Sequence, residues 1–126
     1  MKRAVGIIVA TFITLIGLGV AASPVAASSG DCPSSRFCTW NGINWSGTPA
    51  YVQDIGAFGA CYNLSSSANN NAESLYNRES FQVSLYSGTG GSGYLFSLAA
   101  GSGISDLNHF PSPGGYGNII SSVCHE

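Results

Sequence analysis

Four cysteines have the most readily assigned chemistry in this sequence: Cys32, Cys38, Cys61 and Cys124. An even number of cysteines in a small domain of an oxidising compartment predicts two disulfides, with three possible connectivities. Cys32 and Cys38 flank a turn-forming Pro-Ser-Ser segment that could bring their Cα atoms within bridging range. That pairing would leave Cys61 with Cys124. Zinc binding is the alternative, but the cysteines lack the C-x-x-C spacing of common zinc sites.

Other polar side chains invite a hydrolase interpretation, but their arrangement argues against catalysis. His109 follows Asp106 by three residues in a serine-rich chain. A Ser-His-acid triad needs its serine on a strained turn, and no G-x-S-x-G sequence is present. The carboxylates are scattered, and the two histidines do not have metal-ligand spacing. We therefore expect a protein that is not an enzyme and that uses no cofactor.

An internal repeat supplies the elements that must position these residues. Residues 37–42 align with residues 83–88 at an offset of 46. Residues 70–75 align with residues 118–123 at an offset of 48, so the second copy is longer by about two residues. Each copy is too short to bury a core alone, and we expect the two copies to pack together.

Short segments rich in aromatic and β-branched residues predict strands at residues 36–40, 50–53, 73–76, 81–86, 94–98 and 120–124. Turn clusters of Gly, Asn, Ser and Pro separate them, and no segment after residue 27 predicts a helix. Short strands with regular turns favour an all-β sandwich of Greek-key type. We expect one domain, residues 28–126, made of repeats at about 32–78 and 79–126.

The first 27 residues have the pattern of a cleaved secretory signal peptide: a positive start, an apolar run and small residues before Ser28. A membrane anchor is the alternative, because the apolar run is nearly long enough to span a bilayer. After cleavage the chain would keep two arginines against six acidic residues. Nucleic acids and anionic lipids require a basic face, which this composition does not provide. We therefore expect a secreted, extracellular monomer with no nucleic-acid partner and no membrane contact.

The segment from Trp40 to Gly47 has the form aromatic, four residues, aromatic, one residue, glycine. This spacing resembles the Greek-key signature of the βγ-crystallins, in which the aromatics form a corner over a folded hairpin and the glycine takes a strained conformation. The resemblance implies a βγ-crystallin-like Greek-key β-sandwich built from two repeated motifs. In the second repeat Tyr86 and Gly93 are kept, but Gly91 replaces the second aromatic residue. We therefore expect a degraded corner there.

The βγ-crystallins often bind calcium through an Asn/Asp-Asn/Asp-x-x-Ser/Thr-Ser motif, which residues 69–74 and 117–122 partly match. Calcium prefers several oxygen ligands, and charged ones bind it best. Most candidates here are neutral, and asparagines also form turns. The resemblance implies weak calcium candidates at Asn69, Asn70, Glu73, Asn118 and Ser121.

The C-P-x-x-x-x-C opening at residues 32–38, ahead of this repeat, resembles the secreted bacterial metalloproteinase inhibitors typified by the streptomycete inhibitor. Residues 72–78 and 111–114 are also similar to segments of that family. The resemblance implies a proteinaceous peptidase inhibitor, directed at a secreted metalloproteinase, that docks a loop into the protease cleft.

In that family the reactive bond lies in a second-repeat loop held by its own disulfide. The corresponding loop here contains no cysteine and consists of Ser87, Gly88, Thr89, Gly90, Gly91, Ser92, Gly93 and Tyr94. Four glycines in its six central residues argue against the rigidity that an inhibitory loop needs. The alternative function is a non-inhibitory extracellular binding module for calcium, glycan or protein.

Overall fold

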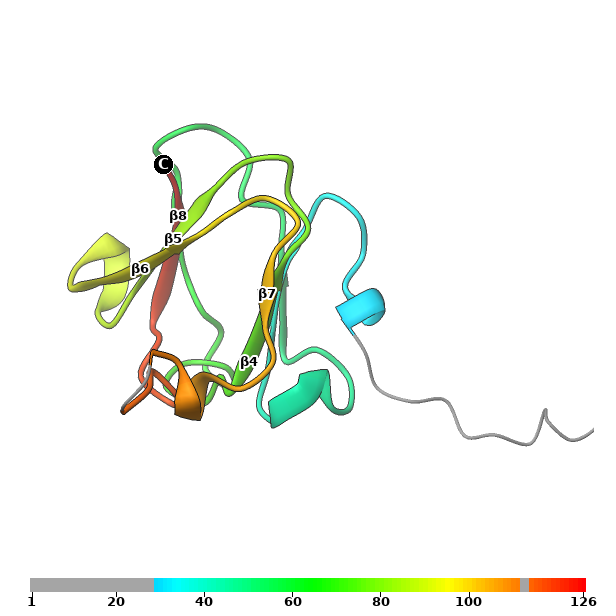
Figure 1. The fold of residues 1–126 in the computed structure, drawn as a ribbon. Coiled ribbons are helices and arrows are strands. Elements are labelled where there is room, and N and C mark those ends of the chain that lie inside the picture. The colour runs from blue at the N-terminus through cyan, green and yellow to red at the C-terminus, as the bar shows by residue number, and fades with distance from the viewer. Residues whose placement is uncertain (1–28, 112–113) are drawn as a thin grey trace, which may run out of the picture.

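Two four-stranded antiparallel sheets form the protein in a computed structural model that describes residues 29–111 and 114–126 (Figure 1). The first sheet has the order β2-β1-β4-β7, with β1 at Phe37–Trp40, β2 at Tyr51–Gln53, β4 at Ser74–Asn77 and β7 at Gly103–Ile104. The second has the order β3-β8-β5-β6, with β3 at Cys61–Asn63, β5 at Val83–Tyr86, β6 at Tyr94–Leu98 and β8 at Ser122–His125. The expected signal peptide, residues 1–27, lies outside the described residues.

Four single 3-10 turns complete the described part of the chain: η2 at Ser29–Asp31, η3 at Ile43–Trp45, η4 at Thr89–Gly91 and η5 at Leu107–His109. Among the described residues, no helix has the length and apolar character needed to cross a membrane. The all-β prediction is therefore confirmed.

Each repeat contributes one strand to the sheet of the other repeat. Strand β3 of the first repeat pairs with β8 in the second sheet, and β7 of the second repeat pairs with β4 in the first sheet. The connections between the sheets are also reciprocal: Asn70 N donates to Ile120 O, and Asn118 N donates to Ala72 O, both at 2.9 Å. Neither repeat has a complete sheet without the other, which explains why two short copies fold as one unit.

The strand prediction finds six of the eight strands in the described residues and misses two. Strand β6 has the predicted bounds, and the other predicted strands differ from the observed ones by a few residues at their ends. The prediction missed β3 and β7, which are three and two residues long. Both are the exchanged edge strands, so their extended conformation depends on pairing with a distant segment rather than on local sequence.

The core lies between the two sheets and is built by alternation along the strands. In β5, Val83 and Leu85 are fully buried in the core cluster, while Ser84 and Tyr86 point to the outer face. Phe37 and Leu75 contribute in the same way from the first sheet. Burying each of these apolar side chains stabilises the fold by about 1.5–3 kcal/mol.

Two disulfides cross-link this framework, Cys32–Cys38 and Cys61–Cys124, and confirm the predicted number. Cys61 and Cys124 lie directly opposite each other in the β3–β8 ladder, with their Cα atoms 4.1 Å apart. This bridge closes a loop with a sequence separation of 63 residues. In the loop-entropy view it contributes about 4 kcal/mol to stability, against about 2 kcal/mol for Cys32–Cys38.

A buried asparagine fastens the crossover between the repeats. Asn77 Nδ2 donates to the carbonyls of Phe81 at 2.8 Å, Leu98 at 3.1 Å and Ala99 at 3.2 Å. Its Oδ1 accepts from Glu79 N at 3.0 Å. Because Asn77 is fully buried, these backbone groups have no water to replace its side chain.

We predict that Asn77→Ala lowers the free energy of unfolding by about 2–3 kcal/mol, because it leaves several buried backbone groups without a partner. The matched control is Asn41→Ala, because Asn41 is exposed and its side chain makes one hydrogen bond, to Ser67 O at 3.0 Å. We expect a loss of less than about 1 kcal/mol for the control. Urea unfolding followed by tryptophan fluorescence measures both, and equal losses would contradict the role given to Asn77.

Candidate functional site

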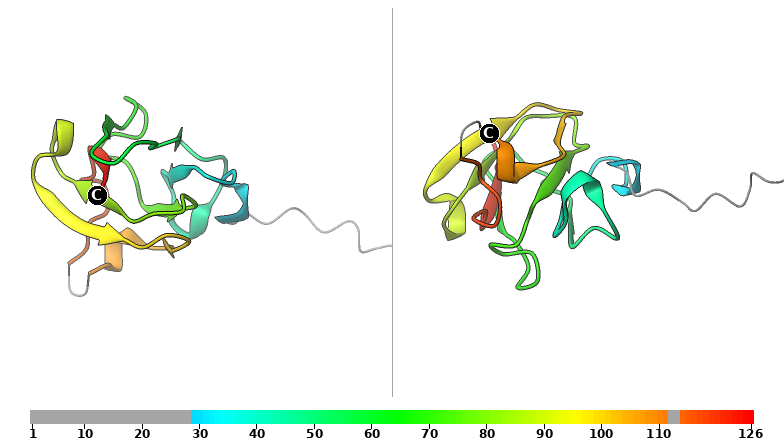
Figure 2. Two further views of the ribbon diagram at one scale, coloured as in Figure 1. Left: turned by 90° about the horizontal axis from the view of Figure 1, so that it is seen from above. Right: turned by 60° about the horizontal axis from the view of Figure 1, so that its bottom comes forward.

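The loop at residues 87–94 forms a folded hairpin that is closed by its own backbone. Ser87 N donates to Gly93 O at 2.9 Å, and Gly88 N donates to Ser92 O at 2.8 Å. Ser92 Oγ then donates to Thr89 O at 2.9 Å. In every view of Figures 1 and 2, its central turn η4 lies on the opposite side of the molecule from η2.

Neighbouring strands fix the hairpin to the second sheet. Gly90 N donates to Asn63 Oδ1 of β3 at 2.7 Å. Ser122 of β8 acts twice, because its Oγ accepts from Gly91 N at 3.0 Å and donates to Gly88 O at 2.6 Å. The tip of the loop is therefore bonded to two strands that belong to other parts of the chain.

The first repeat holds its own hairpin with the same hydrogen bonds. Ser74 Oγ accepts from Trp45 N at 3.0 Å and donates to Gly42 O at 2.7 Å. Ser74 and Ser122 are related by the second offset of the repeat, and Trp45 and Gly91 by the first. The repeat offset relates the two serines in the sequence but does not reveal this role. Asn63 was not predicted as a site residue, because β3 was not predicted.

The two corners differ in what fills them. In the first repeat the Trp45 ring packs edge-on against Tyr76, with ring centres 6.2 Å apart, and Trp45 Nε1 donates to Leu75 O at 3.1 Å. In the second repeat, Gly91 and Cys124 occupy the corresponding positions. A Cβ atom on Gly91 would lie 2.9 Å from Cys124 Sγ and 3.0 Å from Cys61 Sγ.

The Cys61–Cys124 disulfide therefore occupies the space that the missing aromatic side chain would need. The second corner lacks its second aromatic residue, as predicted, but the disulfide fills the space instead. The repeat offset, which aligns Cys124 with Tyr76, is the sequence signal that could have revealed the replacement.

The glycines of the loop adopt the left-handed backbone conformation that the hairpin requires. Gly90, Gly91 and Gly93 have φ values of 63°, 80° and 74°. The equivalent first-repeat residues Asn44, Trp45 and Gly47 have φ values of 57°, 53° and 78°, so both hairpins share one left-handed path. Glycine adopts this conformation without steric cost. The glycine content therefore does not make the loop flexible, because hydrogen bonds to Asn63 and Ser122 hold its backbone.

Tyr94 is the large side chain that this loop presents to solvent, and it is 60% exposed. Its ring lies edge-on to Tyr86, with ring centres 5.8 Å apart. Its hydroxyl hydrogen-bonds to Ser97 Oγ at 3.0 Å, and Ser97 Oγ in turn bonds to Ser84 Oγ at 2.8 Å. Tyr94 is therefore largely exposed, while its hydroxyl group is held by a hydrogen bond to β6.

The calcium candidates fall into separate arrangements. Asn70 Oδ1 accepts from Ser121 Oγ at 3.0 Å, so these two candidates bind each other. Glu73 Oε1 instead accepts from Asn108 Nδ2 at 3.1 Å. Asn69 Oδ1 is buried without a hydrogen-bond partner, and Asn118 adopts a φ of 65° in a turn. Calcium binding at these residues stays a prediction.

One further grouping of polar side chains offers little chemistry. His109 Nδ1 lies 2.8 Å from Asp106 Oδ2, and Asp106 Oδ1 accepts from Asn108 N at 3.0 Å, which makes Asp106 the cap of η5. Within residues 29–111 and 114–126, no group of three or more His, Cys, Asp or Glu residues could hold a metal ion.

Comparison with protein families gives a direct assignment. The peptidase inhibitor family I36 matches residues 25–98, which is more than half of the chain. The chain belongs to this family. The match contains the whole first repeat together with β5, η4 and β6 of the second. It confirms the resemblance to the streptomycete metalloproteinase inhibitors, and it places the protein among non-enzymatic inhibitors that have a peptidase as partner.

A comparison with solved structures gives the fold. The chain matches a structure described as "Evolution of the eye lens beta-gamma-crystallin domain fold", with a TM-score of 0.55 and 15% sequence identity. The match covers 80% of this chain and 91% of that one. The βγ-crystallin-like fold prediction is therefore confirmed. No curated protein matches the chain.

We predict that Gly91→Ala destabilises the protein more than Gly90→Ala does. Both glycines have positive φ, so alanine should cost about 1–2 kcal/mol at either position. An added Cβ meets nothing within 4 Å at Gly90, whereas at Gly91 it meets both disulfide sulfurs. Overpacking there should add about 1–3 kcal/mol. Thermal unfolding of the two oxidised variants measures the difference, and equal melting temperatures would show that the disulfide does not pack against the hairpin.

Proposed function

We propose that this family member is a secreted inhibitor of an extracellular metalloproteinase that docks a preorganised loop into the protease cleft. The inhibitor family supports the general function, and the C-P-x-x-x-x-C opening at residues 32–38 supports the metalloproteinase class. The observation that supports this mechanism is that residues 87–94 are hydrogen-bonded to Asn63 and Ser122 and lie against the Cys61–Cys124 disulfide.

A loop that is already rigid in the free protein suits an inhibitor. Association costs free energy for every loop and side chain that must become ordered in the complex. In this loop Ser87, Gly88, Gly90 and Gly91 already donate their backbone N–H groups to acceptors in the protein. The partner therefore meets a surface whose shape is set in advance. Tyr94 supplies exposed aromatic area beside it.

An extracellular location is part of the proposal. Disulfides persist in oxidising compartments, and both disulfides here join strands or turns of the folded domain. The signal-peptide pattern of residues 1–27 supplies a route of export. After cleavage the protein would share a compartment with secreted peptidases.

The test of the function is an inhibition titration with oxidised protein comprising residues 28–126. We expect stoichiometric inhibition of a thermolysin-type zinc metalloproteinase, with an inhibition constant in the nanomolar range or tighter, because protease–inhibitor pairs are among the tightest complexes. A subtilisin-type serine peptidase serves as the class control and should keep its activity. Absence of inhibition across a panel of secreted metalloproteinases would contradict the proposal. A rise in melting temperature with calcium would then favour the binding-module alternative.

The loop itself can be tested with Gly90→Pro. Proline fixes φ near −65° and has no N–H group, so it cannot keep the φ of 63° or the bond to Asn63. We expect inhibition to weaken by about tenfold or more.

The matched control is Asn44→Pro at the equivalent position of the first-repeat hairpin, where φ is 57° and the N–H donates to Ser105 O. It should destabilise the fold to a similar extent and leave inhibition unchanged. Inhibition constants that respond equally to both variants would show that residues 87–94 are not the contact.

A further inference from the structure

Phe58 is the most exposed large apolar side chain among the described residues, at 80%. Its ring has an edge-on contact with His125, with ring centres 5.5 Å apart. Single exposed apolar residues are common on protein surfaces, so exposure alone says little. The structure of the loop that carries Phe58 is what makes this exposure informative.

The backbone on both sides of Phe58 is held in place. Ala60 N donates to Ala57 O at 3.0 Å and closes a turn with Phe58 at its tip. Gly59 N donates to His125 O, and His125 N donates to Ala60 O, each at 2.9 Å. His125 Nδ1 contacts Gly56 O at 2.7 Å, and because a carbonyl only accepts, Nδ1 must carry the proton.

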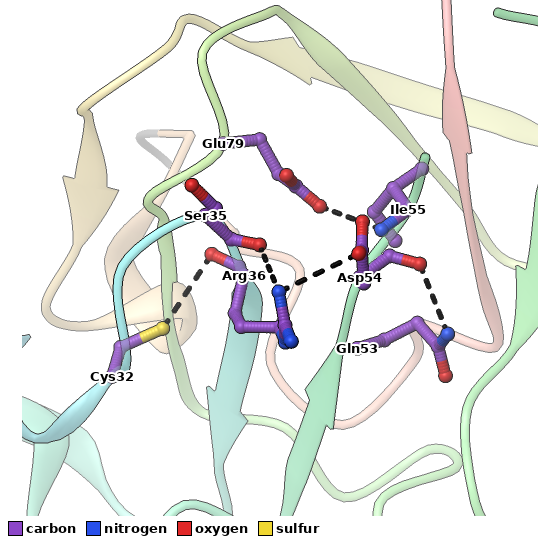
Figure 3. Close-up of polar contacts among 7 residues, drawn as sticks. All are labelled: Cys32, Ser35, Arg36, Gln53, Asp54, Ile55 and Glu79. Carbon is purple, nitrogen blue, oxygen red and sulfur yellow. Dashed lines mark hydrogen bonds and ion pairs between the residues drawn. The ribbon is translucent and has the colours of Figure 1, made fainter. Parts of the chain in front are cut away.

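The beginning of this loop is also anchored to the body of the protein. Ile55 is fully buried, and its N–H donates to Glu79 Oε2 at 2.6 Å (Figure 3). The preceding residue, Asp54, forms an ion pair with Arg36 at 3.5 Å. At the other end the loop enters β3 at Cys61, which the disulfide ties to β8. Phe58 is therefore displayed on a rigid support, as residues 87–94 are.

The second repeat contains the same turn without the aromatic side chain. There Ser102 N donates to Ala99 O at 3.2 Å, Gly101 N donates to Asn77 O and Asn77 N donates to Ser102 O, both at 2.8 Å. Gly101 has a φ of 73°, and the equivalent Gly59 has a φ of 86°.

Asn77 and His125, which bind the two turns, are related by the second repeat offset. The residue at the position of Phe58 is Ala100. The turn thus forms equally well with alanine at its tip, and the fold does not require a phenyl ring at residue 58.

We infer that Phe58 is an apolar anchor that enters a hydrophobic side-chain pocket of the inhibited peptidase, an inference that rests on the proposed inhibitor function. Gly56, Ala57, Gly59 and Ala60 surround it with little side-chain bulk and no charge, so the rim of a concave pocket can approach the backbone closely. A large aromatic residue inserted into a pocket is the usual form of a binding hot spot.

Phe58 and the 87–94 hairpin can contact one partner together. Phe58 precedes Cys61 by three residues, a distance of at most about 11 Å along the chain. Gly91 packs against the sulfur atoms of the same disulfide. A standard protease–inhibitor interface covers about 800 Å² on each partner, which is enough to include both loops. The disulfide would lie near the centre of this surface.

The experiment measures inhibition constants for wild type, Phe58→Ala, Phe58→Leu and the control Val52→Ala against the peptidase that wild type inhibits. Val52 is 44% exposed on β2, in the other sheet. We expect Phe58→Ala to weaken inhibition by about 30-fold or more. Phe58→Leu should lose less, because leucine still fills an apolar pocket, and Val52→Ala should match wild type. Melting temperatures should stay close to that of wild type, because Ala100 shows that the turn tolerates alanine.

The outcomes separate this inference from the function on which it rests. If wild type inhibits no peptidase, the proposed function fails and the inference falls with it. If wild type inhibits and Phe58→Ala inhibits equally well, the inference alone is overturned. If Phe58→Ala changes a dimer into a monomer in size-exclusion chromatography without altering the inhibition constant, Phe58 serves self-association, and the inference is again overturned.

Discussion

The disulfide between Cys61 and Cys124 is the constraint on which the rest of the candidate surface depends. It joins the exchanged edge strand β3 to β8 on the face of the sheet that points away from the core. Gly91 of one loop packs on its sulfur atoms, and the turn that carries Phe58 leads into Cys61. An edge strand of three residues has few hydrogen bonds of its own, so a covalent link is an effective way to hold it. Two loops far apart in sequence thereby share one rigid base.

The two repeats show how one fold can stabilise the same hairpin with different chemistry. The first uses Trp45 against Tyr76, and the second uses a glycine against a disulfide. The serine that bonds the hairpin tip is common to both. Replacing an aromatic corner by a disulfide removes bulky side chains from the hairpin without removing its support. This exchange gives the second repeat a hairpin that has no side chain at residue 91 and is still supported from below.

The sequence predicted the features that depend on local pattern. Residue type and spacing predicted strand β6, the internal repeat, the Greek-key class and the number of disulfides. The connectivity of the four cysteines stayed open among three possibilities. The sequence did not predict β3 and β7, because each of these strands pairs with a strand of the other repeat, which local sequence does not show. The glycine content of residues 87–94 suggested flexibility, because composition does not reveal that Asn63 and Ser122 bind the backbone. The role proposed for Phe58 depends on the equivalence of its turn with the turn at Ala100, which the hydrogen bonds show and the sequence alone does not.

Amide hydrogen exchange gives the most direct test of the shared rigid base, using the oxidised wild type and the double variant Cys61→Ala, Cys124→Ala. The amides to follow are Gly59, Gly90 and Gly91, with Trp45 of the first-repeat hairpin as the internal reference. Loss of the disulfide should speed exchange at Gly59, Gly90 and Gly91 by at least about tenfold relative to Trp45. If exchange at these three glycines changes only in step with Trp45, the disulfide stabilises the whole domain uniformly, and the account of a local support for both loops is wrong.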